Sequence, residues 1–314
     1  MTRIRKSERD FAAADLAAVN GLIGQLTDDD VMMRFSLEAR RDELAELLRQ
    51  AEVETPPEHK ATAELFFGGR PVVGSRGIES EFAGNAVTRF QDLVAKLFAV
   101  QDTGMLAQRG MVPNKSAARL HITNIVRGSF GFLLEEMEPQ GEIVDTALKA
   151  AVEEASQLLG AFGGPDEERF QAAVESIDSR VLKTAREFFD LLRQDAATFR
   201  IVVGEVDKSF GLDAVARAAE RASMTDVSEA EEILIGQLSG TLPDAHMFEF
   251  HAEGDRGLVR GKVDRSIPTS ELSRYNRDLV ERPARATIQI KRLLQRGRVT
   301  RENFVLTRIE LIEK

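Results

Sequence analysis

The chain has 314 residues, 43% of them hydrophobic and 30% charged, which is typical of a globular protein and excludes a disordered or membrane-embedded one. No apolar run is long enough to cross a bilayer, and no apolar core follows the basic N-terminus as in a signal peptide, so we expect a soluble, cytoplasmic protein. The absence of cysteine excludes disulfides, thiolate metal sites and a cysteine nucleophile.

The net charge of −10 is spread unevenly along the chain. Residues 256–308 contain 14 basic and 5 acidic side chains, a local balance of +9. The acidic whole argues against a general nucleic-acid coat protein, whereas the basic segment leaves room for a local anion-binding surface.

The first 57 residues predict a helical segment. A first helix starts after Ser7, and a second helix starts after Ser36 and ends before Pro56-Pro57. Asp28-Asp29-Asp30, between them, is more typical of a solvated cap region than of a metal site. An apolar stripe at helical spacing marks the first helix: Phe11, Ala14, Ala18 and Leu22.

Residues 58–225 predict an α+β domain. Its clearest helix runs from about Glu79 to Gln101, where apolar residues form one continuous stripe. Other expected elements are strands at 61–67 and 199–203 and helices that start after Asp145 and Asp178 and at Leu212.

The stretch 119–136 predicts the hairpin on which this domain is centred, with a turn at Arg127-Gly128. Apolar residues occupy its even positions, which predicts one face for packing under helices: Leu120, Ile122, Val126, Phe130, Phe132 and Leu134. His121 and Thr123 fall on the opposite, odd face.

Residues 229–314 predict a small β-barrel after a polar link at 223–231. Five strands are expected, at 233–240, 247–251, 258–263, 284–291 and 303–312, with a helical or irregular piece at 269–280 after the third. This order is that of an OB-fold, although other small barrels give a similar pattern. The predicted class is therefore α+β, with a mixed N-terminal domain and an OB-like barrel.

Alternation in the barrel strands points several cations outward, and a predicted loop at 292–301 adds four arginines. Together they form the candidate site for nucleic acid or another partner: Arg260, Lys262, Lys291, Arg292, Arg296, Arg298 and Arg301. Such cations also serve merely to keep a barrel soluble and its edges unpaired. Tyr275 is the only tyrosine and tryptophan is absent, so stacking side chains for a single strand are scarce.

The candidate catalytic motifs in the sequence do not have the residue spacing that their chemistry requires. Gly110–Ser116 lacks the glycine pattern of a phosphate-binding loop, and Gly128–Gly131 lacks that of a nucleophile elbow. No pair among the four histidines has the helical spacing of zinc hydrolases. We therefore predict no catalytic residue, no metal site and no cofactor, which favours a protein that is not an enzyme.

Three hypotheses follow. The first is a non-enzymatic binding or adaptor protein whose barrel engages a partner, single-stranded nucleic acid being one candidate. The second is a protein-interaction or homo-oligomerisation module that acts through the acidic N-terminal helices. The third is an enzyme whose site is assembled from distant residues, and a deep pocket that contained His121, Arg119 or Glu135 would support it. None of the three requires a membrane.

Overall fold

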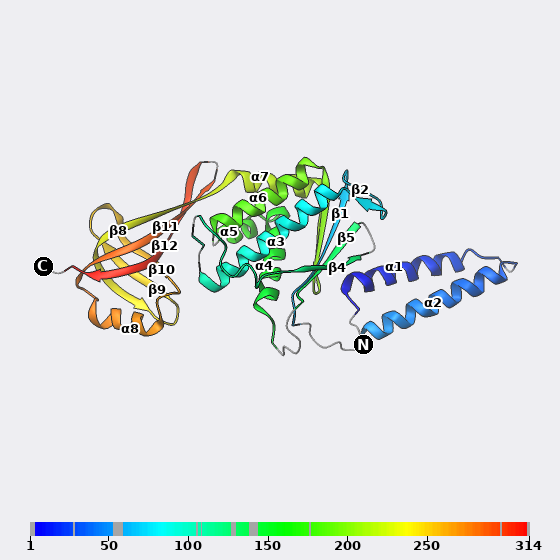
Figure 1. The fold of residues 1–314 in the computed structure, drawn as a ribbon, viewed down its shortest axis with the longest axis horizontal. Coiled ribbons are helices and arrows are strands. Elements are labelled where there is room, and N and C mark those ends of the chain that lie inside the picture. Colours follow the sequence, from blue (N-terminus) through cyan, green and yellow to red (C-terminus); the bar gives the residue numbers. More distant parts are fainter. Residues whose placement is uncertain are drawn as a thin grey trace.

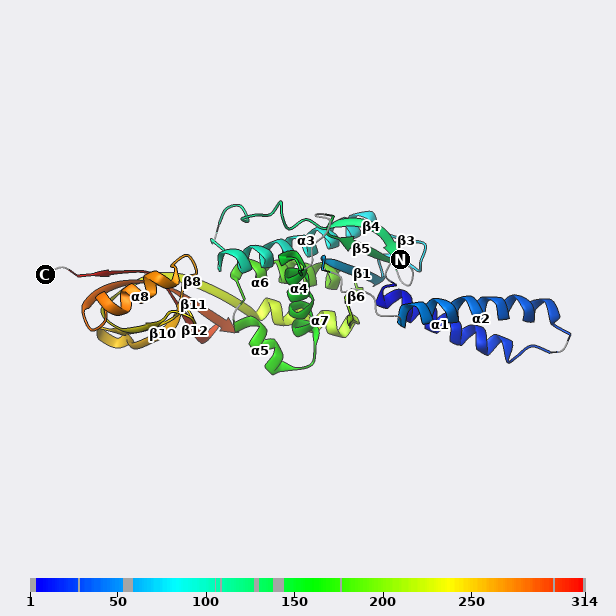
Figure 2. The same cartoon turned by 90° about the horizontal axis from the view of Figure 1, so that it is seen from below.

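The computed structural model describes residues 4–27, 29–52, 59–104, 106–107, 109–126, 130–137, 144–175, 177–295 and 297–312. Figure 1 shows an elongated molecule with a helical hairpin at one end, a helix-and-sheet part in the middle and a β-barrel at the other end. The orthogonal view in Figure 2 shows the same arrangement. The predicted α+β class with a C-terminal barrel is thus confirmed.

Helices α1 (Lys6–Ile23) and α2 (Val31–Glu52) form the N-terminal hairpin. Helix α2 begins earlier than predicted, directly after a turn in which the Asp30 carboxylate accepts hydrogen bonds from the backbone N–H and the hydroxyl of Thr27 at 3.0 and 2.8 Å. The hairpin has a small core of its own, made by Ala12, Val19 and Leu44 with half-buried Leu16, Ile23, Leu37 and Leu48.

The central part contains an antiparallel sheet in the order β4-β5-β1-β6-β7. Its strands are β1 (Thr62–Gly69), β4 (His121–Val126), β5 (Phe130–Glu135), β6 (Ala197–Val203) and β7 (Val206–Phe210). The two predicted strands of the 119–136 hairpin exist as β4 and β5, while the predicted turn at Arg127-Gly128 lies outside the described residues. The pair lies at one edge of the sheet, and β1 is the middle strand. A register shift between Ile122 and Asn124 breaks the predicted even-position face, and Ile122 is exposed. A second, two-stranded sheet pairs β2 (Val72–Val73) with β3 (Gly77–Ile78).

Five helices accompany this sheet: α3 (Ser80–Thr103), α4 (Ala147–Gly163), α5 (Glu167–Glu175), α6 (Ser179–Gln194) and α7 (Leu212–Met224). The long predicted helix is confirmed as α3, and its apolar stripe lies in the main core. Aromatic rings join the layers, since Phe67 of β1 packs edge-on against Phe82 of α3 at 5.5 Å and Phe188 of α6 against Phe199 of β6 at 5.1 Å.

Strand β1 is buried on both faces. Its odd side chains, Ala63, Leu65 and Phe67, join the helix-covered core. Glu64 and Phe66 point to the other face and are each only 2% exposed. The absence of a side chain at Gly131 of β5 makes room for the Phe66 ring, which a Cβ there would meet at 2.6 Å.

The start of α1 covers this second face through charged contacts. Lys6 pairs with Asp207 at 3.3 Å and Arg9 with Glu205 at 2.5 Å, so the hairpin is fixed to the β6–β7 turn region. A guanidinium nitrogen of Arg5 lies 3.8 Å from the Glu64 carboxylate. Burial raises the pKa of Glu64, because the interior disfavours its charged form.

The C-terminal part is a closed barrel in the order β10-β12-β11-β8-β9. Its elements are β8 (Thr225–Leu242), β9 (Met247–Ala252), the short helix η1 (Gly254–Arg256), β10 (Gly257–Val263), α8 (Thr269–Asp278), β11 (Pro283–Gln295) and β12 (Arg298–Leu311). The helix after the third strand is as predicted, and the third and fifth strands pair in parallel. Phe248, Phe250 and Val259 point into the barrel core, as the alternation predicts.

Two connections differ from prediction. The expected polar link at 223–231 is instead the first part of β8, which starts at Thr225 directly after α7. The expected arginine loop at 292–301 is largely strand, because β11 continues to Gln295 and β12 starts at Arg298. The ends of β8, β11 and β12 thus form an arm that reaches the central part, where Leu293 is buried in the main core.

No helix in the described ranges is long and apolar enough to cross a membrane.

Close backbone packing in the barrel makes Gly236 of β8 difficult to replace. A Cβ at Gly236 would lie 1.9 Å from the carbonyl oxygen of His251, whereas one at Gly240 would meet only Asn276 Oδ1 at 3.9 Å. We expect Gly236→Ala to destabilise the barrel by about 1–3 kcal/mol through overpacking.

Thermal unfolding followed by circular dichroism measures this effect, with Gly240→Ala as the matched control on the same strand. Equal melting temperatures for the two variants would contradict the packing argument.

Candidate functional site

The structure divides the six described members of the predicted cation set between two parts of the molecule. Arg260 and Lys262 lie on β10, and their side chains point out of the barrel. The rest belong to the arm: Lys291 and Arg292 are in β11, and Arg298 and Arg301 are in β12. Arg296 lies outside the described residues. The cations therefore do not form one continuous patch.

Arg292 belongs to a compact ion-pair cluster. Its guanidinium contacts Glu302 at 2.7 Å and Glu232 at 2.8 Å, and Arg256 contacts the same two carboxylates, each at 2.9 Å. The hydrogen bond from Arg292 is the main reason why the pKa of Glu302 is lowered, and the two carboxylates raise the pKa of Arg292. The two cations and two carboxylates neutralise one another. Within this cluster, Arg292 of β11 links β8 through Glu232 and β12 through Glu302.

Arg301 also has a partner within the fold. It forms an ion pair with Glu175 at the end of α5, and the side-chain amide of Asn303 donates a hydrogen bond of 2.8 Å to the Glu175 carbonyl. Gln295 donates to the Gln171 side chain at 2.8 Å beside them. These contacts hold the arm against α5. Among the described cations of the arm, Arg298 lies at its exposed end, close to where the loop was predicted.

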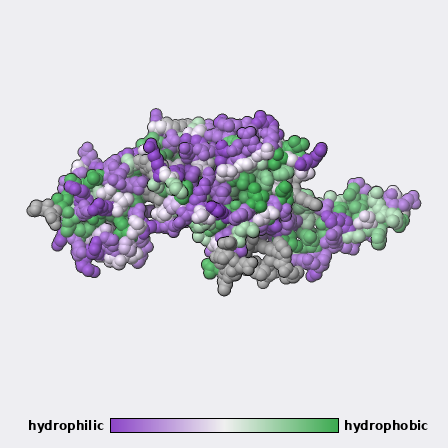
Figure 3. All heavy atoms as spheres, in the orientation of Figure 1, coloured by the Kyte–Doolittle hydropathy of each residue, from purple (hydrophilic) through white to green (hydrophobic). Residues whose placement is uncertain are grey.

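The outward face of β9 and β10 is the second surface. Registers between β8, β9 and β10 place Leu242, Met247 and Lys262 in one row and Glu249 and Arg260 in the next. Arg260 pairs with Glu249 at 2.7 Å, and both side chains are well exposed. Figure 3 shows apolar and polar residues intermixed on the barrel surface. We call this surface the β9–β10 face; it consists of Leu242, Met247, Glu249, His251, Leu258, Arg260 and Lys262.

The site predicted from strand alternation included the cations of the β9–β10 face but left out its apolar residues. Leu242, Met247 and Leu258 are 60%, 42% and 43% exposed. Their parity opposite to Phe248, Phe250 and Val259 was the available signal, because successive strand residues face opposite ways.

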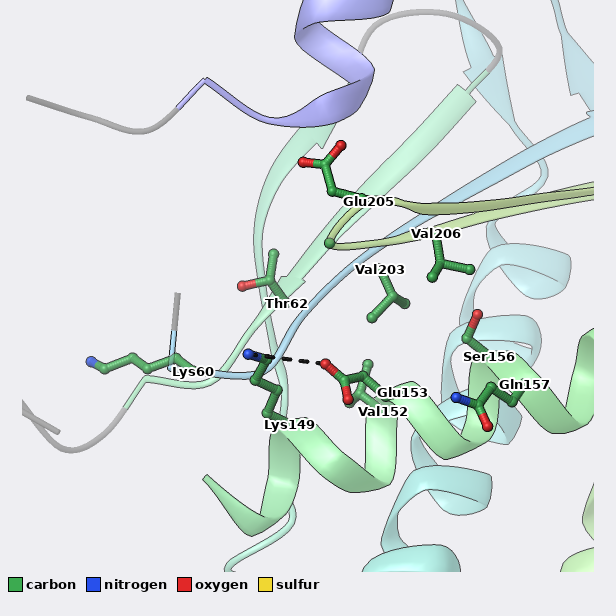
Figure 4. A pocket seen from close by; sticks show the side chains of 11 residues that line it. Lys60, Thr62, Lys149, Val152, Glu153, Ser156, Gln157, Val203, Glu205 and Val206 are labelled. Carbon is green, nitrogen blue, oxygen red and sulfur yellow. Dashed lines mark ion pairs between the residues drawn. The ribbon is translucent and has the colours of Figure 1, made fainter. Parts of the chain in front are cut away.

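A cavity of about 410 Å³ lies in the central part, between the start of β1, the β6–β7 turn and α4 (Figure 4). Val152, Val203 and Val206 form its apolar lining. Lys149 is already paired with Asp145 at 2.9 Å and lies 4.0 Å from Glu153, and Glu205 is paired with Arg9. Lys149, Glu153 and Glu205 therefore each have an ion-pair partner within the fold.

Of three cavities among the described residues, none is lined by His121, Arg119 or Glu135, as a pocket that supported the enzyme hypothesis would be. His121 and Arg119 are exposed, and His121 stands opposite Glu135 in the β4–β5 register. Glu135 accepts a hydrogen bond from the Thr123 hydroxyl. The cavity of Figure 4, a second one beside the start of α4 and a groove beside α1 are all lined by other residues.

No protein-family model, no curated protein and no solved structure matches this chain.

The ion-pair cluster predicts a pH-dependent contribution to stability. Because the folded state lowers the pKa of Glu302 from its ordinary value near 4.5, the cluster stabilises the fold above that pH and loses its effect as pH falls through the lowered value. Glu302→Gln should therefore lower stability most at neutral pH, and the gap in stability to the unaltered chain should narrow as the pH falls below 4.5.

Urea unfolding across this pH range measures the gap. The control is Glu310→Gln, which removes an exposed carboxylate on the same strand, paired with Arg308 at 2.5 Å. A gap for Glu302→Gln that does not change with pH would contradict a charge-based role.

Proposed function

We propose that this protein is a non-enzymatic, cytoplasmic adaptor whose barrel binds a partner through the β9–β10 face. The observation that supports this proposal is the composition of the face. Three exposed apolar side chains, Leu242, Met247 and Leu258, lie beside Arg260 and Lys262. Exposed apolar groups rimmed by polar ones are typical of protein interaction sites.

The same composition favours an acidic protein segment with apolar side chains as the partner. Methionine and arginine are enriched at protein interfaces, and a flexible methionine adapts to different partner surfaces. Arg260 and Lys262 supply positive charge to an acidic partner, although Arg260 must exchange its contact with Glu249. Because Arg260 would contact the acidic partner directly, reversing the charge on β10 tests the proposed binding.

Site-directed photo-crosslinking in cells producing the full chain tests the proposal. We expect a photoreactive residue in place of Leu258 to capture a protein, and Arg260→Glu/Lys262→Glu to abolish that adduct. The matched control places the same photoreactive residue at Arg285, an exposed position of β11 across the barrel. Equal adducts at both positions, or an adduct unaffected by charge reversal, would count against the β9–β10 face.

Single-stranded nucleic acid is the second candidate, and the local balance of +9 in residues 256–308 supports it. Charge attracts phosphates, but sequence-tolerant single-strand binding also uses stacking on aromatic rings. Phe248 and Phe250 point into the barrel and Tyr275 is buried, so none of them is offered to a base. The face is therefore better suited to protein than to bases.

A fluorescent oligodeoxythymidine and an oligouridine of about 20 nucleotides test this candidate by anisotropy at several salt concentrations. If phosphates bind here, Arg260→Ala/Lys262→Ala should reduce the slope of log affinity against log salt by about 1.4, since each lost contact removes about 0.7. The control is Arg298→Ala on the separate arm surface. Absence of binding at low salt, or an unchanged slope in the double variant, would rule out nucleic acid on this face.

A further inference from the structure

Helix α1 has two apolar faces, and the hairpin covers only one of them. Ala12, Leu16, Val19 and Ile23 pack against α2. The stripe identified in the sequence, Phe11, Ala14, Ala18 and Leu22, lies about 110° around the helix from that buried line, because successive residues advance by about 100°. All four of its residues are exposed, Phe11 by 52% and Leu22 by 50%. We call it the α1 stripe.

The α1 stripe is electrically neutral along its length. Between Phe11 and Gly24 the only charged residue is Asp15, and it forms an ion pair with Arg40 of α2 at 2.9 Å. The middle of the stripe has only alanine side chains, which permit close approach of another helix. An identical stripe would therefore meet it without repulsion between like charges.

The order of large and small residues makes the α1 stripe complementary to itself when two copies run antiparallel. Phe11 then lies opposite Leu22 of the other copy, and Ala14 lies near its Ala18. This reciprocity is what a two-fold axis requires, because each contact must occur twice. We propose that the protein forms a homodimer in which two hairpins pair through their α1 stripes to make a four-helix bundle.

The tip of the hairpin supports this arrangement independently. Val31, Met32, Met33 and Phe35, at the start of α2, are between 59% and 82% exposed. A groove of about 660 Å³ lies at the opposite end, where the hairpin meets β4, and Phe11, Leu47 and Ile125 contribute to its apolar lining. Helix α1 is about 27 Å long at 1.5 Å per residue, so the antiparallel register brings each tip to the base of the other hairpin. Both apolar ends are then covered by the same contact.

The shape of the molecule leaves room for this dimer. Figures 1 and 2 both show the hairpin projecting away from the central part. Antiparallel pairing places the two central parts at opposite ends of the bundle and the two barrels farther out. This dimer is independent of the partner proposed for the β9–β10 face, so either can fail without the other.

Sedimentation equilibrium of the full chain up to about 100 µM tests the dimer, because association depends on concentration. We expect Ala14→Glu/Ala18→Glu to raise the dissociation constant by about tenfold or more, since it buries carboxylates in the seam. The matched control is Ala13→Glu/Ala17→Glu, the same change on the exposed side of α1 away from both apolar faces. A monomeric unaltered chain, or equal weakening by both double variants, overturns the proposal.

Disulfide trapping tests the register, and the absence of cysteine from the chain makes each introduced thiol unique. A mixture of Phe11→Cys and Leu22→Cys chains should form a mixed disulfide, whereas neither variant should cross-link with itself. In the antiparallel register two copies of position 11 are about 16 Å apart, beyond the reach of a disulfide. Self-cross-linking of each variant would show parallel pairing and overturn the proposed register.

Discussion

Burial of both faces of β1 is the constraint on which the arrangement of the molecule depends. One face needs a helical layer to cover Ala63, Leu65 and Phe67. The other holds a carboxylate, Glu64, which is costly to bury without polar partners. Arg5, at the N-cap of α1, lies beside this carboxylate, and the Arg200 guanidinium lies over the Phe66 ring, so the buried Glu64 of β1 helps to determine where the hairpin joins the central part.

Local sequence patterns were sufficient to predict elements whose partners are close in the sequence or whose apolar periodicity is strong. The α3 stripe and the alternation around Phe248 and Val259 identify a helix and barrel strands without knowledge of their partners. Strand β7 was missed because Val206–Phe210 offers only a short, largely polar pattern, and its strand character comes from pairing with β6. The extension of β8 back to Thr225 similarly depends on pairing with the distant β11.

In the candidate site too, local patterns predict some features, and others depend on contacts between distant parts of the chain. Parity predicts that Arg260 and Lys262 point outward, and they do. It says nothing about which cations are neutralised inside the fold. Arg292 meets Glu232 of β8, 60 residues earlier, and Arg301 meets Glu175 of α5; both pairings follow from the way the arm lies against the rest of the protein. A charge count along the sequence therefore overstates the positive surface that a ligand meets.

The arm also determines how the ends of the molecule relate to each other. Val227 of β8 and Leu293 of β11 are register partners, and both pack against the main core although their strands continue into the barrel. A barrel joined by a flexible peptide would tumble separately; this one is held by paired strands with buried side chains. The arm therefore sets the distance between the two surfaces proposed for binding, one at the helical end and one on the barrel, and any assembly that used both would have to match this distance.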